Sequence, residues 1–264
     1  LGAGNMGISF IKALLRNKIS ASKIFVLEKR ISPELKKIKL RNKIIVREEA
    51  SKLSQRFRPD IVLLAVKPNQ LDSAMDEDLV SIISNSLVIS IIAGKKNREL
   101  KKITRNKNNT VRAMTNTPVS LGMGTSIVYF DKGIKRKYKN LTREFLALVG
   151  QVNEAKNESI IDTFTAIYGS GPAYIFLMIE SLVRISSKAG LQNSQNMVIQ
   201  TFLGSLLLLL SGKHDAKTLR KNVTSKGGTT QAALSILNSS NGLHKLLSKA
   251  VEKAKKRSKE LSKN

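Results

Sequence analysis

The stretch LGAGNMG, residues 1–7, carries a glycine fingerprint of the form G-x-G-x-x-G. In dinucleotide-binding domains this fingerprint follows a strand and opens a helix. Its glycines permit a tight turn, close approach to a pyrophosphate, and close packing of helix on strand. We assign these roles to Gly2, Gly4 and Gly7. Only Leu1 precedes the fingerprint, so the sequence that follows must decide whether the match is meaningful or accidental.

Helix-like and strand-like segments alternate over residues 1–154. Strands are predicted at residues 23–27, 60–66, 86–92, 110–114 and 125–130, and helices at residues 8–16, 72–83, 97–104 and 137–149. The run DIVLLAV, residues 60–66, is apolar without alternation, which is typical of a strand covered on both faces. The pattern predicts an α/β fold, a Rossmann-like doubly wound parallel sheet whose first strand is truncated.

The strand signals stop near residue 155. Helices are predicted at residues 158–167, 172–189, 194–211, 215–222, 230–237 and 242–261. We therefore predict two domains, a dinucleotide-binding domain over residues 1–154 and an all-helical domain over residues 155–264. The helix over residues 172–189 is apolar nearly all round, so it needs cover that a second subunit would supply.

The composition argues against several kinds of site. The chain has no cysteine and only two histidines, His214 and His244, which excludes a cysteine nucleophile and leaves little for a metal centre. The net charge of +27 is spread along the chain without interleaved aromatic residues, so we expect no dedicated nucleic-acid binding. The most apolar stretch, residues 197–210, is shorter than the roughly 20 residues of a membrane span. No signal peptide is visible, and we expect a cytoplasmic protein.

Three charged residues that follow the strand predicted at residues 23–27 bear on the choice of cofactor. Glu28 follows Gly7 by 21 residues, at the end of a predicted strand, where a carboxylate can accept from a ribose 2′-hydroxyl. The adjoining Lys29 and Arg30 could instead pair with a 2′-phosphate, so NAD and NADP both stay open. All three could also be ordinary solvated charges.

Four further stretches have the character of binding loops. AVKPNQ (residues 65–70), SIIAG (90–94) and MTNTP (114–118) each end a predicted strand, at the sheet edge where α/β proteins bind ligands. Each could also be a plain turn. VTSKGGTTQAAL, residues 223–234, places hydroxyls and flexible glycines before a helix, which suits a carboxylate. The alternative is an ordinary helix start capped by Thr229 or Thr230.

Taken together, seven motifs resemble the pyrroline-5-carboxylate reductase family over essentially the whole chain. They are GAGNMG, AVKP, SIIAG, MTNTP, GSGPAY (residues 169–174), TSKGGTT (224–230) and RSKEL (257–261). The resemblance is specific, because GSGPAY followed by S-x-G-G-T-T is particular to these enzymes.

The resemblance implies reduction of 1-pyrroline-5-carboxylate to L-proline by hydride transfer, the last step of proline biosynthesis, with NADPH preferred and NADH as the alternative. It implies that the cofactor is lined by Gly4, Asn5, Met6, Lys67, Pro68, Ala93, Gly94 and Asn116, to which the fingerprint adds Gly2 and Gly7. The implied substrate residues are Ser225, Gly228, Thr229 and Thr230, and Thr230 looks like the hydroxyl that binds the imine nitrogen. It also implies that the helical domain forms a homodimer, and it leaves open a decamer built from dimers. Hydride addition needs alignment and hydrogen-bond donors but no metal or nucleophile, which suits this composition.

The chain departs from the family pattern at four positions. Thr115 and Lys226 stand where the family has proline, and Lys213 and Asp215 stand where it has an acidic residue and a proline. We expect the lost prolines to add flexibility to the loops and Lys213 to reverse a charge near the site, both of which would lower activity. The alternatives are a degraded, non-catalytic remnant, another oxidoreductase of the hydroxyacid-dehydrogenase type, or a basic nucleic-acid-binding protein.

Overall fold

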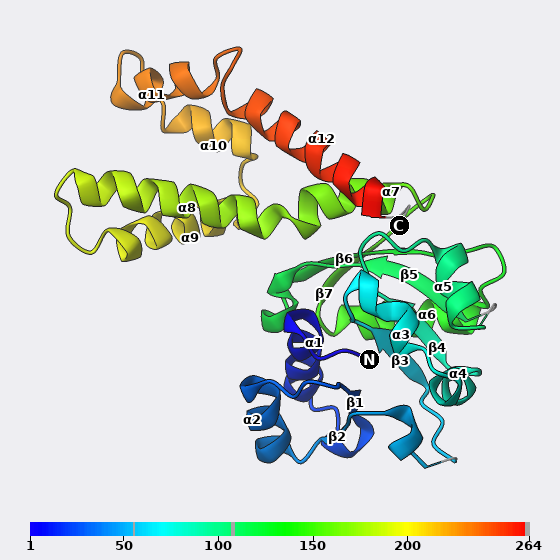
Figure 1. Cartoon of the computed structure of the whole chain (residues 1–264). Helices are drawn as coiled ribbons and strands as arrows, with labels where there is room; N and C mark the ends of the chain where they lie inside the picture. Colours follow the sequence, from blue (N-terminus) through cyan, green and yellow to red (C-terminus); the bar gives the residue numbers. More distant parts are fainter. Residues whose placement is uncertain (55, 107–108, 262–264) are drawn as a thin grey trace. The chain divides into compact units, whose positions relative to one another are not determined.

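The computed structural model describes residues 1–54, 56–106 and 109–261. Contacts within the chain divide it into two compact units. Figure 1 shows the whole chain, coloured by residue number from blue to red. One unit contains Leu1–Pro172 together with the chain from Ala254 onward, and we call it the sheet unit. The other is Ala173–Lys253, the helical unit. The boundary predicted at residues 154 and 155 stays a prediction from sequence.

The sheet unit is built on two sheets. β3 (Ile61–Leu64), β4 (Leu87–Ser90), β5 (Thr110–Met114), β6 (Gly124–Tyr129) and β7 (Gly150–Glu154) form a 5-stranded sheet in that order, and β1 (Phe25–Leu27) pairs with β2 (Ile45–Arg47). All pairs are parallel except β5 with β6. The Rossmann-like architecture predicted from the sequence is confirmed.

Helices cover both faces of the larger sheet, as Figure 1 shows. They are α1 (Asn5–Arg16), α3 (Leu71–Ala74), α4 (Glu77–Ile83), α5 (Asn97–Ile103), α6 (Arg136–Ala147) and α7 (Ile160–Phe164). Helix α2 (Pro33–Asn42) packs instead with the small sheet of β1 and β2. Alternate residues of β4 pack into different cores. Ile89 belongs to the core with Phe10 of α1 and Leu146 of α6, and Val88 belongs to the core with Ile83 of α4. This two-sided cover explains why the predicted strands lacked polar alternation.

The start of the chain lies between β1 and β3. The backbone N–H of Gly2 donates to the carbonyl of Leu27 (3.0 Å), and that of Ala65 donates to the carbonyl of Leu1 (2.8 Å). Beyond Leu1, a cavity of about 730 Å³ runs between the two strands, lined mainly by apolar residues of α1, α4, α6, β1 and β3. The fingerprint turn therefore bridges two strands that are otherwise unpaired along their facing edges.

The structure corrects the predicted elements in detail. The helix predicted over residues 72–83 is two helices, α3 and α4, because the side chain of Asp76 accepts from the Leu79 N–H (2.8 Å) and starts a new helix. Three elements, α2, β2 and β7, were not predicted from the sequence. β7, with the sequence GQVNE, has no buried residue, so it lacks the apolar run that identified the other strands.

The remaining helices are α8 (Gly171–Lys188), α9 (Ser194–Leu210), α10 (Ala216–Asn222), α11 (Thr229–Leu237) and α12 (Leu243–Leu261). A π-helical turn, Thr165–Gly169, joins α7 to α8. In the helical unit only Ser194 and Gly242 are buried. One described helical stretch, Ile160–Lys188, is long and apolar enough to cross a membrane by length and composition, which is weak evidence alone. An apolar helix that is covered by a second chain in a dimer has the same length and composition as such a span.

Candidate functional site

The three fingerprint glycines have three different surroundings. Gly2 has a φ of +86°, and a Cβ added there would lie 2.8 Å from the backbone nitrogen of Val66. A Cβ on Gly7 would lie 2.1 Å from the carbonyl oxygen of Gly2, so helix α1 packs directly on the turn. A Cβ on Gly4 would meet nothing within 4 Å. The turn is thus closed behind Gly2 and Gly7 and open in front of Gly4, where a ligand can approach the backbone.

The first turn of α1 offers donors at that opening. The first N–H of the helix to find a carbonyl is that of Ile8, which donates to Gly4 (2.9 Å). Within the described residues the N–H groups of Asn5, Met6 and Gly7 have no partner. Free N–H groups and the positive end of a helix dipole favour a phosphate.

Glu28 follows β1 and binds the fingerprint turn. One carboxylate oxygen accepts from the Ala3 N–H (2.7 Å) and the other from the Arg30 N–H (3.0 Å). Lys29 and Arg30 are exposed. The carboxylate is therefore a fixed part of the turn, whereas the two basic side chains face solvent beside it.

Three predicted loops lie at one edge of the sheet. β3, β4 and β5 run parallel, so Lys67 and Pro68, Ala93 and Gly94, and Asn116 all follow the carboxyl ends of neighbouring strands. Gly94 has a φ of +76°, and a Cβ there would lie 2.7 Å from the Cβ of Leu261 at the end of α12. This sheet edge, together with the fingerprint turn, is the candidate cofactor site.

The amide of Asn116 is bonded at both ends. Its oxygen accepts from the Thr125 N–H (2.9 Å), and its nitrogen donates to the carbonyl of Tyr168 (3.2 Å) in the π-helical turn. Beside it, the buried Thr115 donates to the carbonyl of Thr125 (3.2 Å) and accepts from the Ser126 hydroxyl (2.9 Å). The flexibility that we expected from the loss of a proline at Thr115 is therefore countered by two hydrogen bonds to β6.

The helical unit holds the predicted substrate residues on one turn. Gly227 has a φ of +72°, and the Gly228 N–H donates to the carbonyl of Ser225 (3.1 Å). α11 starts at Thr229, and its N-cap is Gly228, with no side chain capping it. The alternative of a threonine cap is therefore wrong. Within the described residues the hydroxyls and N–H groups of Thr229 and Thr230 have no partner, so this helix start can bind an anion.

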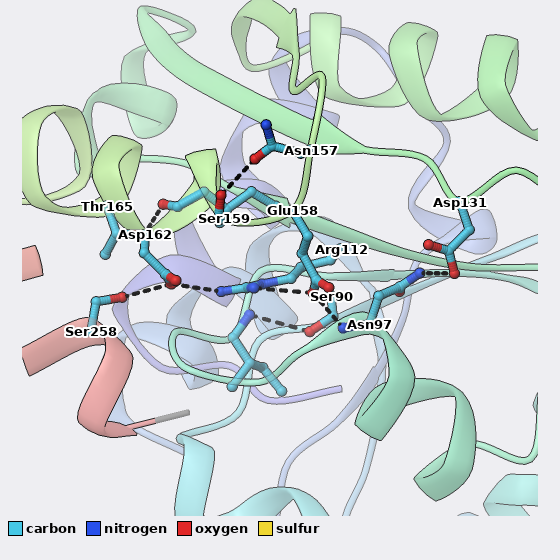
Figure 2. Close-up of polar contacts among 12 residues, drawn as sticks. Ser90, Asn97, Arg112, Asp131, Asn157, Glu158, Ser159, Asp162, Thr165 and Ser258 are labelled. Carbon is cyan, nitrogen blue, oxygen red and sulfur yellow. Dashed lines mark hydrogen bonds and ion pairs between the residues drawn. The ribbon is translucent and has the colours of Figure 1, made fainter. Parts of the chain in front are cut away.

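A polar cluster around the buried Arg112 was not among the predicted site residues. Arg112 in the middle of β5 binds Glu158 and Asp162, and Asn97 binds Asp131 nearby (Figure 2). Lys101 also binds Asp131. A lone arginine in the buried strand sequence TVRAM was the available signal, since a charge in such a strand needs a partner.

Two pKa values beside the cluster are shifted. Burial alone would raise the pKa of Asp131, but hydrogen bonds and charge from Lys101 and hydrogen bonds from Asn97 and Tyr129 outweigh it and lower that pKa below its ordinary value. Burial first, and then the charge of Asp131, raises the pKa of Tyr129.

Two groups of predicted residues thus lie in different units, the cofactor group in the sheet unit and the substrate group in the helical unit. Among residues 1–54, 56–106 and 109–261, no group of three or more histidine, cysteine or acidic residues could hold a metal ion.

Two family models match the chain. Residues 158–261 match a model described as pyrroline-5-carboxylate reductase dimerisation, and residues 1–94 match one described as NADP oxidoreductase, coenzyme F420-dependent. The chain is also similar to the pyrroline-5-carboxylate reductase of Vibrio alginolyticus, with 32% identity over 100% of this chain and 96% of the relative.

Solved structures agree over the whole chain. A pyrroline-5-carboxylate reductase from Coxiella burnetii has 33% identity and a TM-score of 0.85, covering 100% of this chain and 97% of that one. A pyrroline carboxylate reductase from Plasmodium falciparum with NADP bound has 28% identity and a TM-score of 0.84, covering 99% and 96%. Motifs, fold and relatives agree, and the chain belongs to the pyrroline-5-carboxylate reductase family.

Proposed function

We propose that the chain reduces 1-pyrroline-5-carboxylate to L-proline by hydride transfer from a reduced nicotinamide cofactor, the last step of proline biosynthesis. Membership of the family supports the reaction. The observation that carries the proposal is the pair of open anion-binding turns, one at the carboxyl edge of the sheet and one at the start of α11. They suit the two anionic reactants, a dinucleotide and a small cyclic carboxylate.

The residues of the sheet edge fit a dinucleotide. The space in front of Gly4, into which a Cβ would extend freely, and the free N–H groups of Asn5 and Met6 would receive the pyrophosphate. Lys67 and Pro68, Ala93 and Gly94, and Asn116 would line the rest of the cofactor. When bound, the cofactor supplies the hydride, and the chain supplies position and donors.

We propose NADPH as the preferred cofactor and NADH as the weaker alternative. Both oxygens of Glu28 already accept backbone N–H groups, which reduces what this carboxylate can offer a ribose hydroxyl. Lys29 and Arg30 are exposed beside it and could bind a 2′-phosphate. The NADP in the Plasmodium falciparum relative supports the same choice.

On the substrate side, the N–H groups of Thr229 and Thr230 would hold the carboxylate, together with the Ser225 hydroxyl and the backbone at Gly228. The Thr230 hydroxyl would donate to the imine nitrogen, where electron density builds up as hydride adds to the carbon of the C=N bond, and the nitrogen would take its proton from solvent. Donors fixed before the reaction need no reorganisation during it. Thr230 is accordingly our candidate catalytic residue.

The dimerisation domain identified over residues 158–261 supports a homodimer in which the exposed apolar helices of the helical unit meet. We extend the proposal to a decamer that is built from such dimers. We also propose that the protein is located in the cytoplasm. A native mass measurement would detect a decamer directly, and a dimer as the largest species would contradict that part.

The central test follows NADPH absorbance with purified protein. We expect oxidation only when the cyclic imine is present, a lower KM for NADPH than for NADH, and L-proline as the product. A 2-hydroxy or 3-hydroxy acid series in the reverse direction with NADP⁺ is the control for the hydroxyacid-dehydrogenase alternative. A folded protein that binds cofactor but never consumes it with the imine would be the non-catalytic remnant and would reject the proposal.

A further inference from the structure

Arg112 is a charged residue in the centre of the sheet. It pairs in register with Ser90 of β4 and Tyr129 of β6, and only 1% of its side chain is exposed. Its guanidinium donates to Glu158 (3.1 Å) and to Asp162 (3.2 Å), as Figure 2 shows. Because a buried charge is tolerated only when it is paired, the two acidic residues are held against β5.

The same acidic residues hold two more segments. Ser258 of α12, 4% exposed, donates its hydroxyl to the Asp162 oxygen that Arg112 also binds (3.1 Å). The Asn97 N–H at the start of α5 donates to Glu158 (2.6 Å). We call Arg112, Glu158, Asp162 and Ser258 the Arg112 cluster. It joins the consecutive elements α5 and β5 to the chain around α7 and to the last turns of α12, and all four segments belong to the sheet unit.

The cluster constrains the Ala93–Gly94 turn from both sides. One turn of helix beyond Ser258, Leu261 lies directly on Gly94, where an added Cβ would be 2.8 Å from the Leu261 carbonyl carbon. On the other side, Asn97 follows Gly94 by three residues and is fixed by Glu158 and, through its side-chain amide, by Asp131 (2.9 Å). The turn between β4 and α5 therefore has little freedom of its own.

We propose that Arg112, Asp162 and Ser258 are positioning residues for the hydride transfer, which act by holding the end of α12 and the Ala93–Gly94 turn in place at the cofactor edge. The inference rests on the proposed function, because it needs that turn to line the cofactor. Apolar residues could stabilise the sheet as well as this ion pair does. Directional hydrogen bonds, by contrast, fix where the attached segments lie.

Ser258→Ala is the sharpest test, because it removes the hydroxyl that donates to Asp162 and leaves the Arg112 pairs intact. We expect the Kd for NADPH, measured by calorimetry, to rise about tenfold, since a hydrogen bond to a charged group contributes roughly that factor. The KM for the imine should change less than about twofold by the same scale. Amide hydrogen exchange at residues 93–97 should become faster. Ser81→Ala, an exposed serine of α4, is the matched control and should leave all three unchanged.

Asp162→Asn is the second variant, since it keeps an acceptor for Ser258 but removes the charge facing Arg112. It should raise the Kd for NADPH further than Ser258→Ala does. If either variant lowers the thermal midpoint while the Kd and the exchange at residues 93–97 stay at wild-type values, the cluster is purely structural and the inference is overturned. A wild-type protein that binds no nicotinamide cofactor would overturn the proposed function itself, and the inference with it.

Discussion

The two units of this chain differ in what they do with apolar side chains. In the sheet unit, every residue of β4 and β5 is buried, and helices cover both faces. In the helical unit, large apolar side chains stay exposed, among them Phe176 at 64% and Leu210 at 74%. The sheet unit therefore has its own hydrophobic core, whereas the apolar side chains of the helical unit are left uncovered within a single chain. A second chain is the natural cover for them, as the dimerisation domain indicates.

The sheet unit contains a cavity of about 730 Å³ between β1 and β3. In a recombinant protein that starts at Leu1, five added β-branched apolar residues would let an extended segment pair with both strands. We expect the free energy of unfolding to rise by about 4 kcal/mol, since each buried side chain contributes roughly 1.5–3 kcal/mol against the cost of ordering it. Denaturant titration measures the change. An extension of five glycine and serine residues is the control, and an equal gain from both would refute the prediction.

A charge introduced on the exposed face of α8 should weaken the dimer, whereas a charge introduced at an exposed position of the sheet unit should not. Leu177→Asp would place a charge in the dimer interface, and we expect the dissociation constant of the dimer to rise at least about a hundredfold. Leu40→Asp alters a residue of α2 that is 70% exposed, and it should leave assembly unchanged. Sedimentation velocity distinguishes the two. Dissociation by both variants, or by neither, would contradict this assignment of the face.

Because the proposed substrate residues and cofactor residues lie in different units, a change in one group should alter turnover without altering the affinity for NADPH. Thr230→Ala removes a hydroxyl of the helical unit, so we expect kcat to fall about tenfold while the Kd for NADPH stays within about twofold. Thr230→Ser should restore turnover. Thr201→Ala, which changes an exposed threonine of α9, is the control. Equal losses in kcat and cofactor affinity would remove Thr230 from its proposed role.

A smaller effect concerns acid stability of the sheet unit. The pKa of Asp131 is lowered in the folded protein, so its ionised form stabilises the fold above the ordinary value of 3.8, and this contribution is lost as pH falls through the lowered value. Asp131→Asn should therefore cost about 1 kcal/mol at neutral pH and nothing in strong acid. Unfolding curves of both proteins from pH 7 to pH 2 test this, with exposed Asp60→Asn as the control. A constant difference at all pH values would contradict it.

The fold was predictable where burial is complete and unpredictable where it is not. Apolar runs located β3, β4 and β5, and the motifs identified the family. The polar edge strand β7 gave no such signal, and the helix break at Asp76 depends on one side-chain hydrogen bond. The glycine roles at Gly2, Gly4 and Gly7 followed from the fingerprint alone. The partners of Arg112 could not be foreseen, because Glu158 and Asp162 lie more than forty residues further along the chain. Whether Gly228 and Thr230 meet the cofactor edge stays a prediction.

The return of α12 to the sheet unit limits how this protein can be divided. The front half looks like a portable cofactor-binding module, yet Asp162 is bonded to Ser258 and Gly94 is covered by Leu261, both contributed by the last residues that the structure describes. A recombinant fragment that stops at residue 154 would lack all three of Asp162, Ser258 and Leu261. Gene fusions or chimaeras that exchange the cofactor module between relatives would therefore have to transplant the final helical turns along with it.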